Sequence, residues 1–121
     1  MLFGVLCFTS NKKNLDLPVA SKIEFEHVNG GAITRVYESN KVSSLIKDIE
    51  EKSSYSKESV NDQPIGIDYI KMKMDTMTYY VHERNGKTYI EEPYNGIWKI
   101  PSDLYKNIKN NKDKLIVEFE D

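Results

Sequence analysis

The chain has 121 residues, which suits one domain, and its 17 basic and 19 acidic residues leave a formal net charge of −2. Only two of the basic residues are arginine, so the chain lacks the basic footprint of a nucleic-acid-binding protein. A single cysteine excludes an internal disulfide framework and a cysteine-based metal cluster.

Residues 1–10 form an uncharged apolar run that ends in small polar residues, and we expect them to be the remainder of an export leader. A first strand packed on the core and an expression artefact are the alternatives. Cys7 follows a bulky leucine and is therefore a poor acceptor for a lipid anchor. We interpret residues 11–20 as a polar linker and residues 21–121 as a single domain.

Two segments in which apolar and polar residues alternate, 22–28 and 33–37, flank the turn sequence Asn29-Gly30-Gly31. Alternation on both sides of an Asn-Gly dipeptide predicts an antiparallel hairpin. A helix capped by Ser39 or Asn40 is predicted next, because the apolar residues that follow have the spacing of one helical face. These apolar residues are Val42, Leu45, Ile46 and Ile49.

Residues 53–64 are rich in serine and poor in apolar side chains, which predicts a surface loop. Apolar and polar residues alternate again in segments 67–74, 78–84 and 87–92, and Asn85-Gly86 separates the last two. The pattern predicts three strands of an antiparallel meander.

A two-residue turn at Asn85-Gly86 sets the register of the second hairpin, because opposed residues share a face of the sheet. The opposed pairs are Tyr80 with Glu91, Val81 with Ile90 and His82 with Tyr89. The aliphatic pair marks the side of the core. The other two pairs are expected to form a polar and aromatic stripe that faces outward.

The segment Pro93-Tyr94-Asn95-Gly96 is a tight-turn sequence, in which proline is favoured at the second position of the turn and Gly96 is able to take a positive φ. Residues 97–100 are predicted as a short strand or extended link, and residues 101–103 as the start of a second helix. Residues 115–119 are a last strand or a helical tail. Together these elements predict an α+β fold, with an antiparallel sheet of about five strands in ββαβββα order, packed on one main helix, and a short C-terminal helix.

The chain shows no catalytic signature. Its two histidines, His27 and His82, lie on separate predicted strands, whereas a zinc site needs three or four ligands at set spacing. There is no glycine-rich phosphate loop, and the single cysteine lies in the predicted leader. Glu91 and Glu92 are neighbours on a strand and point to opposite faces, so they do not form a catalytic pair. We therefore predict no metal, no cofactor and no catalytic residues.

Aromatic residues are concentrated between positions 89 and 98, a segment that includes the only tryptophan. Large rigid side chains grouped at a turn are typical of contact surfaces, because they bury area at low entropic cost. The alternative is that the same rings fill the core of a small domain. If the rings form a contact surface, its residues are Tyr80, His82, Tyr89, Glu91, Tyr94, Asn95 and Trp98.

This aromatic segment, taken with the helix at 42–49, the loop residues 59–64 and the strand at 70–74, resembles a family of uncharacterised domains. The family is found in small exported proteins and lipoproteins of low-GC Gram-positive bacteria. The resemblance extends roughly from Ile23 to Ile108 and implies exported or membrane-anchored placement, and the family has no assigned activity. A lipid-bearing cysteine after small residues, which the resemblance leads us to expect before the domain, is not present.

Two functions are compatible with these patterns. The first is a non-catalytic, monomeric domain of the cell envelope or extracellular space that binds a protein or peptide partner and is tethered through its N-terminus. An inhibitor or immunity protein is one version of it. The alternative is a small hydrolase or carbohydrate-active enzyme in which Glu91 is a general acid, provided that burial raises its pKa. A deep pocket around Glu91 would favour the enzyme.

Overall fold

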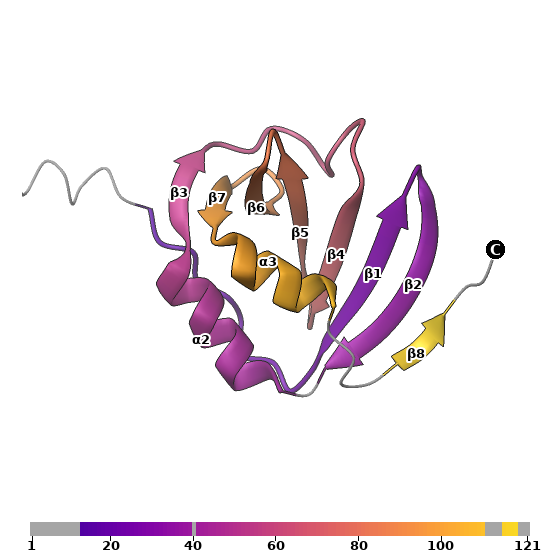
Figure 1. The fold of residues 1–121 in the computed structure, drawn as a ribbon. Helices are drawn as coiled ribbons and strands as arrows, with labels where there is room; N and C mark the ends of the chain where they lie inside the picture. Colours follow the sequence, from indigo (N-terminus) through magenta and orange to yellow (C-terminus); the bar gives the residue numbers. More distant parts are fainter. Residues whose placement is uncertain (1–12, 40, 111–114, 119–121) are drawn as a thin grey trace, which may run out of the picture.

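Strands dominate the computed structural model, which describes residues 13–39, 41–110 and 115–118 (Figure 1). The strands are β1 (Ile23–Asn29), β2 (Ala32–Ser39), β3 (Ser54–Lys57), β4 (Tyr69–Met74), β5 (Met77–Arg84), β6 (Lys87–Glu92), β7 (Gly96–Ile100) and β8 (Leu115–Glu118). The helices are α2 (Val42–Lys52) and α3 (Ser102–Lys109). Within the described ranges these strands form one sheet in the order β3-β7-β6-β5-β4-β1-β2-β8, and every neighbouring pair is antiparallel. The α+β class is confirmed, and the expectation of about five strands is wrong.

Both predicted hairpins are present. Asn85 and Gly86 have φ angles of 54° and 78°, as a type I′ turn requires, and the three residue pairs expected across this turn are in register. In the first hairpin Asn29 pairs with Ala32, so the central turn residues are Gly30 and Gly31. The turn is therefore one residue later than the Asn-Gly dipeptide.

Helix α2 begins without the predicted side-chain cap. Its N-cap residue is Lys41, which makes no capping bond through its side chain. Ser39 ends β2, three residues before the helix begins, and its Oγ accepts the N–H of Lys41 at 3.1 Å. Asn40 lies outside the described residues. Helix α3 follows Pro101 and carries Asp103 in its first turn, as the sequence predicts.

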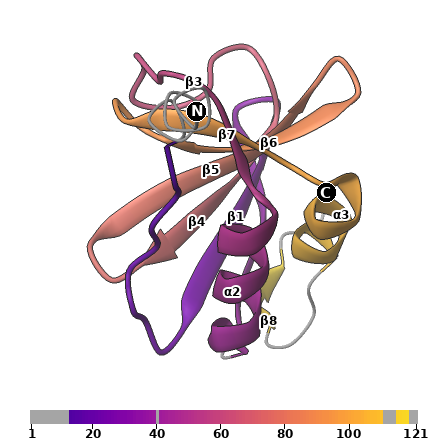
Figure 2. The ribbon, with the colours of Figure 1, turned by 90° about the vertical axis from the view of Figure 1, so that its left-hand side faces the viewer.

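The two helices cover the same face of the sheet (Figures 1 and 2). Residues paired across neighbouring strands share a face, so the registers define this core face from β1 to β7. Its side chains include Phe25, Met72, Tyr79, Val81, Ile90 and Trp98. Val42, Leu45 and Ile49 of α2, with Leu104 and Ile108 of α3, complete the same cluster.

The segment expected to be a polar linker packs on the domain in its described part. Leu15 and Leu17 are 2% and 9% exposed and belong to the core cluster. The N–H of Leu17 donates to Glu50 Oε2 at 2.8 Å, and Trp98 Nε1 donates to the carbonyl of Lys13 at 2.8 Å. The domain boundary expected at residue 21 therefore does not match the packing, because Leu15 and Leu17, which precede it, contribute to the core. The expected leader, residues 1–10, lies outside the described residues.

The predicted loop at 53–64 also differs from the structure. Ser54 and Tyr55 belong to β3, where they pair with Lys99 and Trp98 of β7. Strand β3 lies at the edge of the sheet, where polar and exposed side chains are tolerated. Its partner is more than 40 positions away in the sequence, so local composition carries no sign of this strand.

The turn before β7 is closed by the N–H of Asn95, which donates to the carbonyl of Glu92 at 3.0 Å. Tyr94 has a φ of 61°, a conformation for which glycine or asparagine is preferred, and Gly96 is not among the residues with a positive φ. The positive φ of this turn is thus at Tyr94 and not at Gly96. Gly96 is buried in β7, where a side chain would collide with the ring of Trp98.

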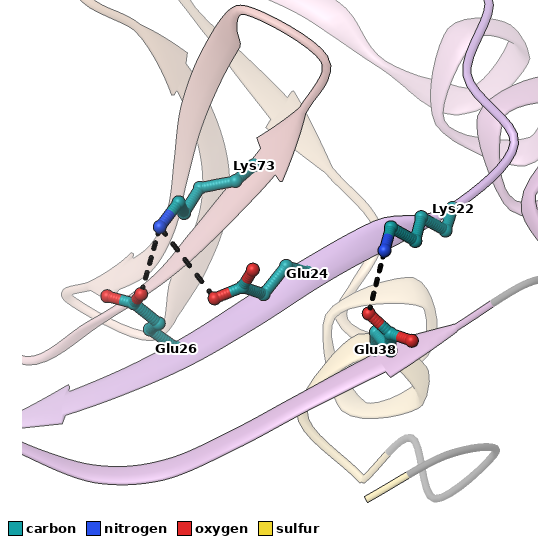
Figure 3. Close-up of polar contacts among 5 residues, drawn as sticks. All are labelled: Lys22, Glu24, Glu26, Glu38 and Lys73. Atoms are coloured by element: carbon teal, nitrogen blue, oxygen red, sulfur yellow. Dashed lines mark hydrogen bonds and ion pairs between the residues drawn. The ribbon is translucent and has the colours of Figure 1, made fainter. Parts of the chain in front are cut away.

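On the face opposite the helices, β1, β2 and β4, with Lys22 just before β1, carry a group of charged side chains (Figure 3). Lys73 Nζ lies 3.2 Å from Glu26 Oε2 and 3.7 Å from Glu24 Oε2, while Lys22 pairs with Glu38 at 3.5 Å. The hydrogen bond to Glu26 is the main reason that the pKa of Lys73 is raised. Solvated pairs of this kind contribute less than about 1 kcal/mol each, so they add little to the stability of this part of the sheet.

A buried polar contact joins the sheet to α3. Tyr37 donates its hydroxyl proton to the carbonyl of Ile108 at 2.6 Å, and its oxygen lies 2.8 Å from His27 Nε2. Since a hydroxyl has one proton, His27 must be the donor in the second contact. Burial, helped by the positive charges of Arg35 and Lys109, lowers the pKa of His27 to about 4.

We expect His27 to make the domain less stable in acid. The unfolded chain binds a proton at His27 as the pH falls through about 6.5, whereas the folded chain does so only near pH 4, so acid favours unfolding in this interval. The expected loss is about 2 kcal/mol between pH 7 and pH 4, after allowance for partial solvent screening. Urea unfolding of the wild type and of His27→Gln at both pH values measures it. Equal losses in the two proteins would contradict the assignment.

Candidate functional site

A cavity of about 570 Å³ opens on the outer face of the sheet. Its walls come from β5, β6 and β7 and from the chain at and after β3, at residues 56–61. The charged and aromatic residues among its walls are Lys57, Glu58, His82, Arg84, Tyr89 and Glu91. The segment after β3 therefore forms a wall over a face of the sheet that was predicted to face solvent.

Three buried polar side chains form a connected cluster at the cavity. Ser59 Oγ donates to Glu91 Oε2 at 2.5 Å, and Glu91 Oε1 lies 3.1 Å from His82 Nε2. The three residues are 4%, 3% and 1% exposed. The N–H of Tyr94 donates to Ser59 Oγ at 3.2 Å, so the cluster also holds the turn between β6 and β7.

The imidazole of His82 is oriented by this cluster. Burial lowers the pKa of His82, and the positive charges of Arg84 and Lys57 act in the same direction, whereas the hydrogen bond to Glu91 opposes them. A neutral ring that donates Nε2–H to Glu91 carries its lone pair on Nδ1. Nδ1 is buried and has no hydrogen-bond partner among the described residues. His82, a residue of the cavity wall, thus carries a buried acceptor that is unused among the described residues.

The arrangement differs from a serine-histidine-acid triad. In such a triad the histidine contacts the serine, whereas here the hydroxyl of Ser59 is bonded to Glu91. Both carboxyl oxygens of Glu91 are engaged, so its role is to hold His82 and Ser59. Among the described residues no group of three or more His, Cys, Asp or Glu is placed to hold a metal ion.

Four of the seven predicted contact residues are buried. Trp98 is 1% exposed and pairs with Ile90, so it faces the core rather than outward. Tyr80, at 6%, is on the expected face, but the ring of Tyr69 packs edge-on against it with centroids 5.2 Å apart. His82 and Glu91 are covered as described above. The expectation that the stripe faces solvent is therefore wrong for Tyr80, His82 and Glu91, and Trp98 fills the core, as the alternative for the aromatic segment has it.

The remaining three residues are more accessible. Tyr89 is half-buried in the wall of the cavity, with its ring centroid 5.9 Å from that of His82. Asn95 has a structural role, because its Nδ2 donates to Glu92 Oε1 at 2.8 Å and its carbonyl accepts from Lys13 Nζ at 2.6 Å.

Tyr94 is the exposed member of the set, at 66%. Two other exposed apolar side chains, Val60 at 73% and Ile65 at 69%, belong to the segment between β3 and β4. Tyr94 and Ile65 line a shallow hollow that shares Asn61 with the cavity, so the two depressions are neighbours. A hydrogen bond to Asp62 raises the pKa of the Tyr94 hydroxyl.

Three residues of the site were not found from the sequence. Ser59, Lys57 and Arg84 come together only because the segment after β3 folds over β5 and β6. A serine in a serine-rich segment and a cation at a hairpin end carry no local sign of this arrangement. Pairing of β3 with β7 is the cause, and it is a long-range contact.

The chain matches the family model DUF5301, whose description is "Domain of unknown function (DUF5300)", over residues 11–99. The chain belongs to this family. The match covers about three quarters of the chain. It includes the described part of the segment predicted as a linker, strand β3, the cavity walls and the turn at Tyr94. No curated protein and no solved structure matches the chain.

Proposed function

We propose that this DUF5301 domain is a non-catalytic module that binds a peptide segment of a partner protein at the cavity and at the neighbouring ring of Tyr94. The observation that carries the proposal is the buried, unpartnered Nδ1 of His82 in the wall of a cavity of about 570 Å³. A buried polar atom without a partner costs roughly 1–3 kcal/mol. A bound ligand that supplies the missing partner recovers this cost.

The exposure and the backbone conformation of Tyr94 support the same proposal. It is a large exposed aromatic residue held at a φ of 61°, a conformation that costs a non-glycine residue roughly 1 kcal/mol or more. Strain of this kind is concentrated at functional sites. Val60 and Ile65 extend the apolar surface around it, and exposed aromatic anchors are typical of interfaces.

A peptide library displayed on phage tests the proposal. Peptides selected on the wild-type domain are expected to bind Tyr94→Ala about tenfold more weakly by fluorescence anisotropy, because the ring supplies much of the apolar contact. Tyr94→Gly removes the same ring and also relieves the strain, so it is expected to bind as weakly as Tyr94→Ala. Its stability is expected to equal or exceed that of the wild type by about 1 kcal/mol.

Ile33→Ala is the matched control, since Ile33 is 46% exposed on β2, at the other end of the sheet. Its affinity for the selected peptides is expected to be that of the wild type. Wild-type affinity in both Tyr94 variants, with the fold intact by circular dichroism, would refute the proposed surface.

Location is a further part of the proposal. We place the protein in the cell envelope or outside the cell because of its resemblance to domains of exported proteins and lipoproteins. Among the described residues no helix is long and apolar enough to cross a membrane. Fractionation of cells that express the full encoded protein tests this location, and recovery only from the cytoplasm would exclude it.

The cavity also supports a second candidate, the small hydrolase or carbohydrate-active enzyme that uses Glu91. Glu91 and His82 line the cavity and contact each other, and Nδ1 of His82, which has no partner among the described residues, is the candidate general base. Chromogenic ester and glycoside substrates distinguish the two functions. Turnover that is lost in Glu91→Gln would favour the enzyme over the binding module.

A further inference from the structure

We propose that the cavity binds a carboxylate of an acidic peptide between Nδ1 of His82 and the side chains of Lys57 and Arg84. The inference rests on the proposed function and names the chemistry of the peptide. It starts from His82, which is 1% exposed and has one ring nitrogen engaged by Glu91 and the other unpartnered among the described residues.

Two cations flank this histidine in the wall of the cavity. Lys57 is the last residue of β3, and Arg84 is the last residue of β5, two positions after His82 on the same face. Both are close enough to His82 to act on it electrostatically, and both line the same cavity. In the part of the chain that the structure describes, neither forms an ion pair, so both are available to an anion.

The charges decide between the possible partners of Nδ1. Lys57 and Arg84 would repel a metal ion or an ammonium group, while of the two carboxylates in the wall Glu91 has both oxygens engaged and Glu58 is exposed. A neutral hydroxyl or amide would satisfy Nδ1 but would leave the two cations unused. A carboxylate uses all three groups, provided that His82 takes up a proton and donates Nδ1–H to it, while Nε2–H still donates to Glu91.

Proton uptake follows from this geometry. Titratable and charged groups face His82 from each strand around it, and the negative charge of a bound carboxylate would offset the effect of the cations. These groups are Lys57 of β3, Glu58 after β3, Tyr69 of β4, Arg84 of β5, and Tyr89 and Glu91 of β6. Binding should therefore become tighter as the pH falls, in the range where the ligand carboxylate stays ionised.

Three short peptides serve as probes. The first is acetyl-Ala-Ala-Glu-Ala-amide, and the second is its neutral analogue acetyl-Ala-Ala-Gln-Ala-amide. The third is acetyl-Ala-Ala-Gln-Ala with a free C-terminal carboxylate, which is its only charge. Each is titrated into the 15N-labelled domain at pH 8 and pH 6, and two-bond 1H–15N spectra report the protonation of each nitrogen of His82. We expect at least one carboxylate peptide to bind about fivefold more tightly than the neutral amide at pH 6. Its affinity is expected to rise about threefold from pH 8 to pH 6, with the His82 signals moving toward those of an imidazolium.

Exposed cations provide variants that keep the fold. Arg84→Gln and Lys57→Gln are each expected to remove most of the preference for the acidic peptide. Lys47→Gln is the matched control, because Lys47 is an exposed residue of α2, on the opposite face of the sheet, and the variant removes the same charge. Its affinity is expected to equal that of the wild type.

The outcomes separate this inference from the proposed function. If peptides from the library bind at Tyr94 but the acidic and neutral probes bind equally at both pH values, the carboxylate site is refuted and the binding module stands. If succinate or inorganic phosphate binds in an Arg84-dependent manner while neither carboxylate peptide binds, the site does not take peptides and the inference is also refuted. If no library peptide binds, the proposed function itself is refuted.

Discussion

Replacing Glu91 by alanine is expected to destabilise the domain by about 3 kcal/mol, measured by urea unfolding with Trp98 fluorescence. Glu91 is 3% exposed, and its two oxygens accept from Ser59 at 2.5 Å and from His82 at 3.1 Å. Its removal strands a hydroxyl and an imidazole N–H in a buried site, and each such group costs roughly 1–3 kcal/mol. Partial access of water through the cavity keeps the expected sum toward the lower end.

Glu91→Gln separates the hydrogen bonds from the charge. The amide has the shape of the carboxylic acid and keeps one carbonyl acceptor, so the loss is expected to be about half that of Glu91→Ala. Glu83→Ala, an exposed change on the same hairpin, is the control and is expected to lie within about 0.5 kcal/mol of the wild type.

The stability losses caused by substitutions at His82 and Glu91 are also expected to be coupled. The double variant His82→Ala, Glu91→Ala should lose less stability than the sum of the single variants, since each single change leaves a partner unsatisfied. Additive losses, or a Glu91→Ala protein as stable as the wild type, would show that the cluster is solvated rather than buried.

The second hairpin shows what sequence pattern can predict. Asn85-Gly86 fixes a two-residue turn, and the turn fixes which residues of β5 and β6 share a face, so the register was predictable from two residues and a period of two. The same logic predicted α2 from its apolar spacing and α3 from the proline at its start. These are local signals, and local signals were sufficient for each of these elements.

Burial of the outer face was not predictable in the same way. Alternation says that Tyr80 and His82 point away from the helices, and it carries no information about what covers them. At His82 the cover comes from residues 56–61, held in place by the pairing of Tyr55 with Trp98 and by the bond from Ser59 to Glu91, and at Tyr80 it comes from the ring of Tyr69. A polar edge strand has little intrinsic signal, because its stability comes from the strand beside it.

The packed N-terminal segment is an intermediate case. Leu15 and Leu17 alternate with Asn14 and Asp16, which is a weak strand-like pattern in an otherwise polar stretch. That pattern was a signal that could have been used to predict burial. The bond from Trp98 to the carbonyl of Lys13 was not predictable, since it joins positions that are far apart in the sequence.

Gly96→Ala is expected to destabilise the domain by about 2 kcal/mol, although alanine is normally preferred to glycine in a strand. An added Cβ would lie 2.8 Å from Trp98 Cη2, 2.9 Å from Trp98 Cζ3 and 3.1 Å from Tyr55 Cε1. The indole cannot move aside freely, because Nε1 donates to the carbonyl of Lys13 and the ring packs edge-on against Tyr55 with centroids 5.7 Å apart. The glycine is thus required by space and not by its φ angle.

A smaller ring distinguishes this steric explanation from a conformational one. In a Trp98→Phe background the two indole atoms that collide with the new methyl group are absent and only the close contact with Tyr55 Cε1 remains, so Gly96→Ala is expected to cost less than about 0.5 kcal/mol. Chemical denaturation of the four proteins of this cycle, followed by circular dichroism, measures the difference. An equal cost in both backgrounds would mean that strand β7 needs glycine for its backbone. Because β7 directly follows the turn that presents Tyr94, a Gly96→Ala protein is also expected to bind selected peptides more weakly, through displacement of that turn rather than loss of a contact.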